Sequence, residues 1–176
     1  MKIPSIDLYA QYKELKKEID EALKRVIKRQ DFILGRELGL FEKEFSRWSN
    51  TRYAVGVGSG TAALFLAVKS LEIGEKDEVI VPAFTYIATS LAVSYAGAKP
   101  VFVDIEEDTY NIDVCKIKKA ITKNTKAIIP VHLYGQPANM PEILKIAKNY
   151  NLRVIEDAAQ AHGASIKMPK GNWQLA

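Results

Sequence analysis

The fold is decided by one stretch, Val154-Ile155-Glu156-Asp157-Ala158-Ala159-Gln160-Ala161-His162-Gly163. Apolar residues run into an acidic pair and then into small residues, which is typical of a buried parallel strand that ends at a pocket. Ligands of open α/β sheets bind beyond the carboxyl ends of the strands, so Asp157 and Gln160 are expected to face a ligand. A buried carboxylate needs a cation or a strong donor, such as the protonated ring nitrogen of a heteroaromatic cofactor. Alternatively, Asp157 caps a following helix and Gln160 bonds to backbone.

Composition indicates an ordinary globular chain. The 176 residues are 48% hydrophobic and 26% charged, and one domain of this length can bury a sizeable core. No apolar run is long enough to span a bilayer and no secretory leader is recognisable, so a cytoplasmic protein without a membrane segment is expected. The net charge of +4 is spread among acidic residues, which favours an anionic small molecule over nucleic acid. Cys115 is the single cysteine, which excludes an internal disulfide and a cysteine-cluster metal site.

The apolar periodicity changes near residue 53. Before it, amphipathic helices are predicted over 9–28 and 38–48, either as an arm that packs on something else or as part of an ordinary core. After it, short apolar strands alternate with helices, which predicts right-handed crossovers and a mostly parallel sheet covered on both faces. Strands are predicted at 53–57, 78–81, 99–103, 126–131 and 153–156, and helices at 61–71, 85–96, 115–120 and 141–149.

A glycine-rich turn, residues 56–64, follows the first predicted strand. Such a turn lets the backbone approach a ligand, and the helix after it offers free amides and a positive dipole end to an anion. The dinucleotide-binding pattern would need glycine where Thr61 stands, and the lysine of a P-loop is absent, so nucleoside triphosphate chemistry is disfavoured.

Two further strand ends carry aromatic and histidine residues. Tyr86 or Phe84 could lie flat on a planar ligand, although this segment alone favours two core aromatics. His132 and His162 are candidates for an acid–base group, but a single histidine in such a place is more often a hydrogen-bonded structural residue.

In combination, these motifs resemble the DegT/DnrJ/EryC1/StrS family of pyridoxal 5'-phosphate (PLP)-dependent sugar aminotransferases. The resemblance runs from about Ile3 to Ala164. It is carried by Ser59-Gly60-Thr61-Ala62-Ala63-Leu64, Asp77-Glu78-Val79-Ile80-Val81-Pro82, Thr85-Tyr86-Ile87-Ala88-Thr89, Gly97-Ala98-Lys99-Pro100-Val101-Phe102-Val103-Asp104, His132-Leu133-Tyr134-Gly135-Gln136 and Glu156-Asp157-Ala158-Ala159-Gln160-Ala161-His162-Gly163.

The resemblance implies a role for each ring-binding residue. Asp157 would pair with the pyridinium nitrogen and keep it protonated, so that the ring acts as an electron sink. Gln160 would hydrogen-bond the phenolic oxygen, and Tyr86 would stack on the ring face. His162 is placed near the ring by its adjacency to this stretch.

The resemblance also implies where the phosphate and the covalent anchor lie. Gly60, Thr61 and Ala62 would bind the phosphate through backbone and hydroxyl donors. The lysine that forms the Schiff base in the family comes one strand and turn after the Asp-Ala-Ala-Gln stretch, which this chain does not reach. Lys167 and Lys170 are too close to Asp157 in sequence to replace it, so the chain is expected to be a shortened or frameshifted member that does not transaminate alone.

The resemblance further implies an α/β three-layer sandwich with a mostly parallel sheet, like the large domain of fold type I PLP enzymes but truncated. We expect a helical arm at 1–50, an incomplete PLP-binding domain at 51–164 and a divergent tail at 165–176. The expected activity is amino transfer from an amino acid, with glutamate as the donor, to a nucleotide-linked keto-sugar, in a homodimer. Alternatives are a non-catalytic remnant or regulatory protein that binds PLP or a sugar nucleotide, and an unrelated α/β nucleotide binder.

Overall fold

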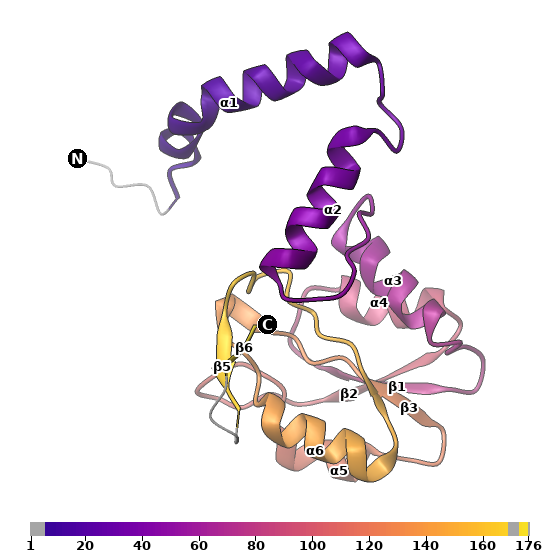
Figure 1. Ribbon diagram of the computed structural model, residues 1–176. Helices are drawn as coiled ribbons and strands as arrows, with labels where there is room; N and C mark the ends of the chain where they lie inside the picture. The colour runs from indigo at the N-terminus through magenta and orange to yellow at the C-terminus, as the bar shows by residue number, and fades with distance from the viewer. Residues whose placement is uncertain (1–5, 169–172, 176) are drawn as a thin grey trace. The chain divides into compact units, whose positions relative to one another are not determined.

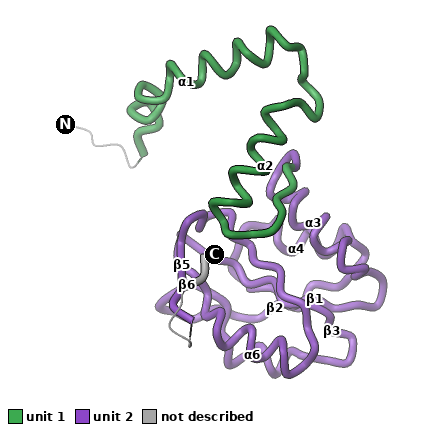
Figure 2. The backbone as a smooth tube through the Cα atoms, viewed as in Figure 1, with its two compact units in different colours: residues 1–56 green, residues 57–176 purple. Residues whose placement is uncertain are grey.

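The computed structural model describes residues 6–168 and 173–175 and divides into two compact units. Unit 1 comprises residues 1–56 and unit 2 comprises residues 57–176 (Figure 2). Helices and strands carry the labels of Figure 1. In the described part of the chain, no helix combines the length and the apolar character needed to cross a membrane.

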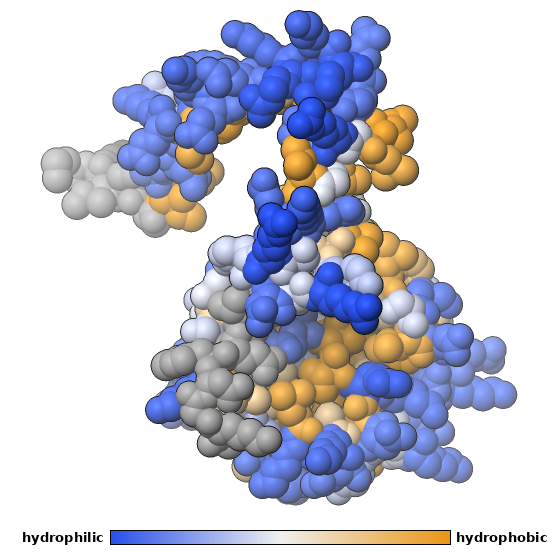
Figure 3. Space-filling model, in the orientation of Figure 1, coloured by the Kyte–Doolittle hydropathy of each residue, from blue (hydrophilic) through white to orange (hydrophobic). Residues whose placement is uncertain are grey.

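Unit 1 consists of two amphipathic helices, α1 (Leu8–Arg29) and α2 (Arg36–Trp48). The turn between them is fixed by Asp31, whose carboxylate accepts hydrogen bonds from the Arg36 amide and the Arg29 guanidinium, both at 3.1 Å. Neither helix has a buried residue. Apolar side chains therefore lie exposed among charged ones on the surface of this unit (Figure 3).

The segment after α2 is not the strand predicted for residues 53–57. The Gly56 amide donates to the Glu42 carboxylate at 2.8 Å, and a Cβ atom added at Gly56 would lie 2.3 Å from Cδ1 of Leu38. The segment thus lies against α2, and no described strand pairs with it. An apolar stretch becomes a strand by pairing with a neighbour, so the prediction from pattern alone was wrong here.

Unit 2 is built on a four-stranded parallel sheet with the order β2-β1-β3-β4 (Figure 1). β1 lies in the interior of the sheet, with Val79 opposite Pro100 of β2 on one side and Ala127 of β3 on the other. Every residue of β1 is buried, as expected for a strand covered on both faces. The strands are β1 (Glu78–Pro82), β2 (Lys99–Val103), β3 (Thr125–Ile128) and β4 (Arg153–Val154).

Helices cover both faces of this sheet. Successive strand residues point to opposite faces. Accordingly, Val79 and Val81 pack in a core with α3 and α4, whereas Ile80 packs in a second core with α5 and α6. Each of these fully buried side chains contributes about 1.5–3 kcal/mol. The predicted three-layer α/β sandwich is confirmed. The helices are α3 (Gly60–Ser70), α4 (Ala88–Tyr95), α5 (Val114–Ala120) and α6 (Met140–Tyr150).

Some elements are shorter than predicted. β3 ends at Ile128, and not at residue 131, because Pro130 has no N–H group to donate to a neighbouring strand. The chain still runs beside the extension of β4, since the Asp157 amide donates to the Pro130 carbonyl at 2.9 Å. α4 begins at Ala88, which leaves Thr85 in the loop beyond β1. An antiparallel pair, β5 (Ser165–Lys167) and β6 (Trp173–Leu175), follows the main sheet in sequence.

The strand order reverses between β1 and β3. The chain adds β2 on one side of β1, then returns to add β3 and β4 on the other side. Loops that leave two neighbouring parallel strands in opposite directions open a crevice at their carboxyl ends. The fold therefore predicts a ligand site beyond the ends of β1 and β3.

Candidate functional site

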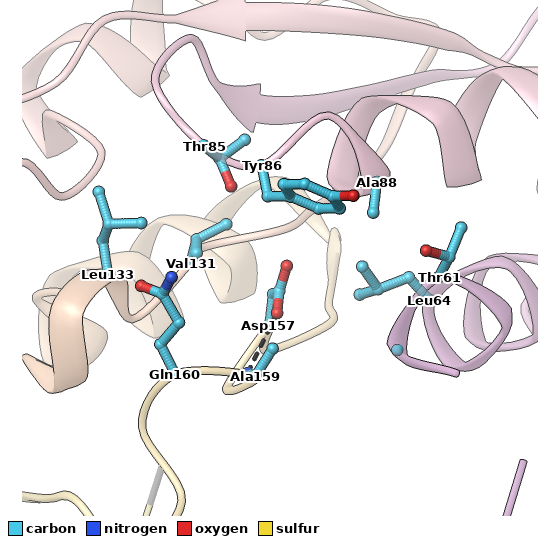
Figure 4. A pocket seen from close by; sticks show the side chains of 11 residues that line it. Thr61, Leu64, Thr85, Tyr86, Ala88, Val131, Leu133, Asp157, Ala159 and Gln160 are labelled. Atoms are coloured by element: carbon cyan, nitrogen blue, oxygen red, sulfur yellow. Dashed lines mark hydrogen bonds between the residues drawn. The ribbon is translucent and has the colours of Figure 1, made fainter. Parts of the chain in front are cut away.

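A pocket of about 300 Å³ lies beyond the carboxyl ends of β1, β3 and β4 (Figure 4). Its walls come from the start of α3, the loop from β1 into α4, the loop after β3 and the turn after β4. This is the position that the strand order favours. The lining residues are Gly60, Thr61, Leu64, Thr85, Tyr86, Ala88, Val131, Leu133, Asp157, Ala159 and Gln160.

Asp157 supplies a buried carboxylate to the pocket, with 8% of the residue exposed. Its Oδ2 accepts the hydroxyl proton of Thr89 at 3.0 Å, and its Oδ1 accepts the Ala159 amide at 3.2 Å (Figure 4). Both donors are neutral, so a cationic group on a ligand would balance the carboxylate charge. No helix lies within residues 158–164, so the alternative of a helix cap is wrong.

Gln160 is oriented by a turn with an unusual backbone. Its Oε1 accepts the Tyr134 amide at 2.8 Å, so its amide nitrogen faces the pocket (Figure 4). Tyr134 and Gly135 have φ of +56° and +86°, and this conformation costs about 1–3 kcal/mol at a non-glycine residue. Buried Asn111 helps to hold the turn, because its Oδ1 accepts the Leu133 amide at 3.1 Å.

The N-terminus of α3 also lines the pocket. Ser59 caps the helix, since its hydroxyl accepts the Ala62 amide at 3.1 Å and its carbonyl accepts the Ala63 amide at 2.9 Å. The amides of Gly60 and Thr61 come before the first helical hydrogen bonds and, with the helix dipole, suit an anion. Of the three predicted phosphate-binding residues, Gly60 and Thr61 line the pocket, whereas Ala62 does not.

Tyr86 extends over the mouth of the pocket. Its ring lies above Asp157 in the view of Figure 4, and 75% of the residue is exposed. An aromatic ring so placed can cover a planar ligand that contacts the carboxylate below. Phe84, the other aromatic candidate, does not line the pocket and packs instead against Tyr110, with ring centroids 5.9 Å apart.

His132 has a structural role. The residue is fully buried, its Nδ1 accepts the Ala138 amide at 3.0 Å, and its Nε2 lies 3.1 Å from a carboxylate oxygen of Glu156. Because Nδ1 accepts, the neutral ring carries its proton on Nε2 and donates it to Glu156. Since Glu156 precedes Asp157, this contact braces the strand end that carries the pocket carboxylate.

Three other residues considered from the sequence are not among those that line the pocket. His162 is exposed. Lys167 lies in β5 with its residue exposed. Lys170 lies outside the described residues.

Two site residues, Thr85 and Thr89, were not predicted. Thr85 lines the pocket, and Thr89, which is fully buried, donates to Asp157. Both hydroxyl groups belong to the Thr85-Tyr86-Ile87-Ala88-Thr89 motif that follows a predicted strand end, so the sequence did contain a signal.

Comparison with curated proteins places these residues in a known context. The chain is 51% identical over 164 residues to a UDP-N-acetyl-3-dehydro-α-D-glucosamine 3-aminotransferase from Acidithiobacillus ferrooxidans, covering 93% of this chain and 44% of that protein. It is 48% identical over 164 residues to a pleiotropic regulatory protein from Geobacillus stearothermophilus, again with 93% and 44% coverage. The chain therefore spans less than half the length of these relatives.

Solved structures share the fold. DesV of Streptomyces venezuelae, solved with a ketimine intermediate, superposes with a TM-score of 0.89 at 50% identity, over 92% of this chain and 43% of that one. A putative sugar aminotransferase from Streptococcus pneumoniae in its PLP form gives a TM-score of 0.80 at 33% identity, over 88% and 43%.

A family model agrees with these likenesses. It matches residues 13–171, which begins later and extends further than the stretch of resemblance seen in the sequence, and it includes every residue that lines the pocket. The chain belongs to the DegT/DnrJ/EryC1/StrS aminotransferase family.

Proposed function

We propose that this chain forms the cofactor-binding part of a PLP-dependent aminotransferase that acts on a nucleotide-linked keto-sugar. The observation that carries the proposal is the Asp157 carboxylate, which is buried in the pocket and hydrogen-bonded by neutral donors alone among its described contacts. A protonated pyridine nitrogen is the kind of cation that such a carboxylate suits.

The other pocket residues fit the rest of the cofactor. The phosphate suits the amides of Gly60 and Thr61 at the positive end of α3, a contact worth up to about 2 kcal/mol where it is partly buried. The phenolic oxygen suits the amide nitrogen of Gln160, whose orientation is set by the bond from Tyr134. The exposed ring of Tyr86 suits one face of the pyridine ring.

PLP, when bound, supplies an electron sink that makes the carbon bearing the substrate amino group acidic. The residues of this chain prepare that chemistry. Asp157 would hold the proton on the ring nitrogen, and Gln160 would orient the ring by donating to the phenolic oxygen of the cofactor. Tyr86 would restrict the ring to one plane and exclude water from the ring face that it covers. The proton shuttle is a task for a lysine, and we propose that neither Lys167 nor Lys170 performs it.

The remaining features belong to the same proposal. Glutamate is the proposed amino donor, and the proposed assembly is a cytoplasmic homodimer. Support for a sugar substrate comes from the relatives, whose names include a nucleotide-sugar aminotransferase. The bounds expected from the sequence, an arm at 1–50 and a cofactor domain at 51–164, are also part of the proposal, as are cofactor contacts from Ala62 and His162.

The proposal is tested by titrating the purified chain with PLP, reducing it with borohydride and measuring its intact mass. We expect saturable binding with a cofactor absorbance band and no specific covalent adduct. Peptide mapping that placed an adduct at Lys167 or Lys170 would contradict the proposed absence of an anchor in this stretch. Absence of saturable PLP binding would contradict the proposed cofactor site itself.

A second candidate is a regulatory protein that binds PLP or a sugar nucleotide without turnover. The pleiotropic regulatory protein among the relatives favours it. Amino transfer assayed with glutamate and a UDP- or dTDP-linked keto-sugar distinguishes the two, in the purified chain or in any longer protein that contains it. Turnover supports the enzyme, and binding without turnover supports the regulator.

A further inference from the structure

A chain of hydroxyl groups leads from the pocket wall to the Asp157 carboxylate. Thr89, on the first turn of α4, is fully buried, and its Oγ1 lies 3.0 Å from Oδ2 of Asp157. The Oγ1 atoms of Thr85 and Thr89 lie 3.1 Å apart, and Thr85 lines the pocket. Thr89 and Asp157 are 68 positions apart in the sequence, so their hydrogen bond connects the β1–α4 loop region to the segment that follows β4.

The direction of these hydrogen bonds follows from the number of protons available. An ionised carboxylate only accepts, so Thr89 must donate its single hydroxyl proton to Asp157. The Thr89 oxygen is then left to accept the hydroxyl proton of Thr85. Hydrogen bonds in such a series polarise one another and strengthen the terminal one.

The two carboxylate oxygens are therefore held from different elements. Oδ2 is held by Thr89 of α4, and Oδ1 by the amide of Ala159 in the following turn. Two fixed donors restrict rotation of the carboxylate about its Cβ–Cγ bond, while each oxygen keeps a lone pair for a ligand.

The neighbouring residue, Ser90, shows that a buried hydroxyl group on α4 does not need a partner distant in sequence, as Thr89 has in Asp157. Ser90 is also buried, and its hydroxyl donates to the Ile87 carbonyl of its own chain segment at 3.1 Å. Local bonding of this kind satisfies a serine or threonine without any long-range partner. Thr89 instead bonds to a residue distant in sequence that faces the pocket.

We propose that Thr89 is a positioning residue, which holds the Asp157 carboxylate in the orientation that meets the ring nitrogen of PLP. Thr85 completes the arrangement by fixing the direction of the Thr89 hydroxyl. This inference rests on the proposed cofactor site, and it adds two residues that act on the cofactor through Asp157.

The test compares Thr89→Val, which keeps the shape but removes the donor, with Thr89→Ser, which keeps the donor. Ser90→Ala is the matched control. PLP affinity of the full chain is expected to fall about fivefold in Thr89→Val, from the loss of one hydrogen bond, and to stay within about twofold of wild type in Thr89→Ser and Ser90→Ala.

A cofactor analogue with carbon in place of the ring nitrogen separates positioning from packing. Thr89→Val should bind this analogue as well as the wild type does, and it should lose no further PLP affinity when combined with Asp157→Asn. Equal weakening for PLP and the analogue, or an additive double variant, would overturn the proposal.

A measurement on the cofactor-free chain tests the hydrogen bonds of Thr85, Thr89 and Asp157 independently of whether the chain binds PLP. In the cofactor-free chain, the Thr89 hydroxyl proton should exchange slowly with water by NMR, and faster in Asp157→Asn and Thr85→Val. Equal exchange in all three chains overturns the hydroxyl series, whatever the chain binds. If exchange follows the expectation but the wild type binds no PLP, the proposed cofactor site fails and the positioning role toward PLP fails with it.

Discussion

Two carboxylates of unit 2 are buried to the same extent but lie at opposite ends of the sheet. Glu78 begins β1 and Asp157 lies beyond β4, and each residue is 8% exposed. Glu78 has a cationic partner, Lys99, at 3.1 Å, and it accepts the Thr122 hydroxyl at 2.5 Å. Asp157 has a comparable hydroxyl partner but none of its described hydrogen bonds comes from a cation.

The difference teaches that burial alone does not mark a functional carboxylate. The Thr122 hydroxyl, followed by Lys99, holds the pKa of Glu78 below its ordinary value, so the protein itself stabilises that charge. Asp157 faces a pocket, and a ligand can complete its environment. We therefore expect changes at Glu78 to affect stability and changes at Asp157 to affect binding.

The largest expected effect is on cofactor affinity. Asp157→Asn keeps the shape but removes the charge, so PLP affinity should fall about 10- to 100-fold, the equivalent of one charge-assisted hydrogen bond. Absorbance titration of the full chain measures it, with Glu78→Gln as the matched control at unchanged affinity. An equal loss in both variants would show that the two carboxylates do not differ in role.

The next effect is on stability. Glu78→Gln removes the charge that Lys99 and Thr122 stabilise, and the free energy of unfolding at pH 7 should fall by about 1–2 kcal/mol. Urea unfolding followed by far-ultraviolet circular dichroism measures the change. Asp157→Asn should destabilise the chain less than this, and a larger loss there would contradict the division between the two ends of the sheet.

The stability difference between wild type and Glu78→Gln should also depend on pH. Because the folded pKa of Glu78 is lowered, its contribution is fully present above the unfolded value of about 4.3 and is lost as the pH falls through the folded pKa. The difference in unfolding free energy should therefore be constant from about pH 6 to 8 and shrink below about pH 4. Urea unfolding at each pH checks the sign, and a difference that grew in acid would refute the assignment.

The smallest effect is expected at Lys99. Its side chain is 71% exposed, so its ion pair with Glu78 is screened by water. Lys99→Gln should lower the free energy of unfolding by no more than about 0.5 kcal/mol. Thr122→Val should lower it more, since it removes the hydroxyl that donates to the buried Glu78 carboxylate at 2.5 Å. The reverse order in urea unfolding would make the cation the main partner.

Most of the fold follows from apolar periodicity. The continuous apolar run within Glu78–Pro82 predicts a strand buried on both faces, and its successive residues do pack into two different cores. The failure at residues 53–57 has a physical cause, because alternation shows that a segment can be a strand but does not supply the neighbour with which it must pair. The early end of β3 was readable from Pro130.

The site was predictable where chemistry is local and not where it depends on contacts distant in sequence. Asp157 and Gln160 follow a strand, and the sequence alone points to a pocket at such an end. Thr89 reaches Asp157 across 68 residues, and Tyr134 turns its amide toward Gln160 through a left-handed backbone. Such contacts depend on how the loops are folded together, which periodicity does not encode.

The strand order also has a consequence for a chain that is still being synthesised. β1 acquires its neighbour β2 early, but its other neighbour, β3, and then β4 come later in the sequence. Asp157 and Gln160, which come 97 and 100 residues after Gly60, are among the last parts of the pocket to leave the ribosome. A nascent chain can thus bury most of the core that β1 forms with α3 and α4 before the Asp157 carboxylate has been synthesised. A ligand bound by Asp157 can therefore influence only the final stage of folding.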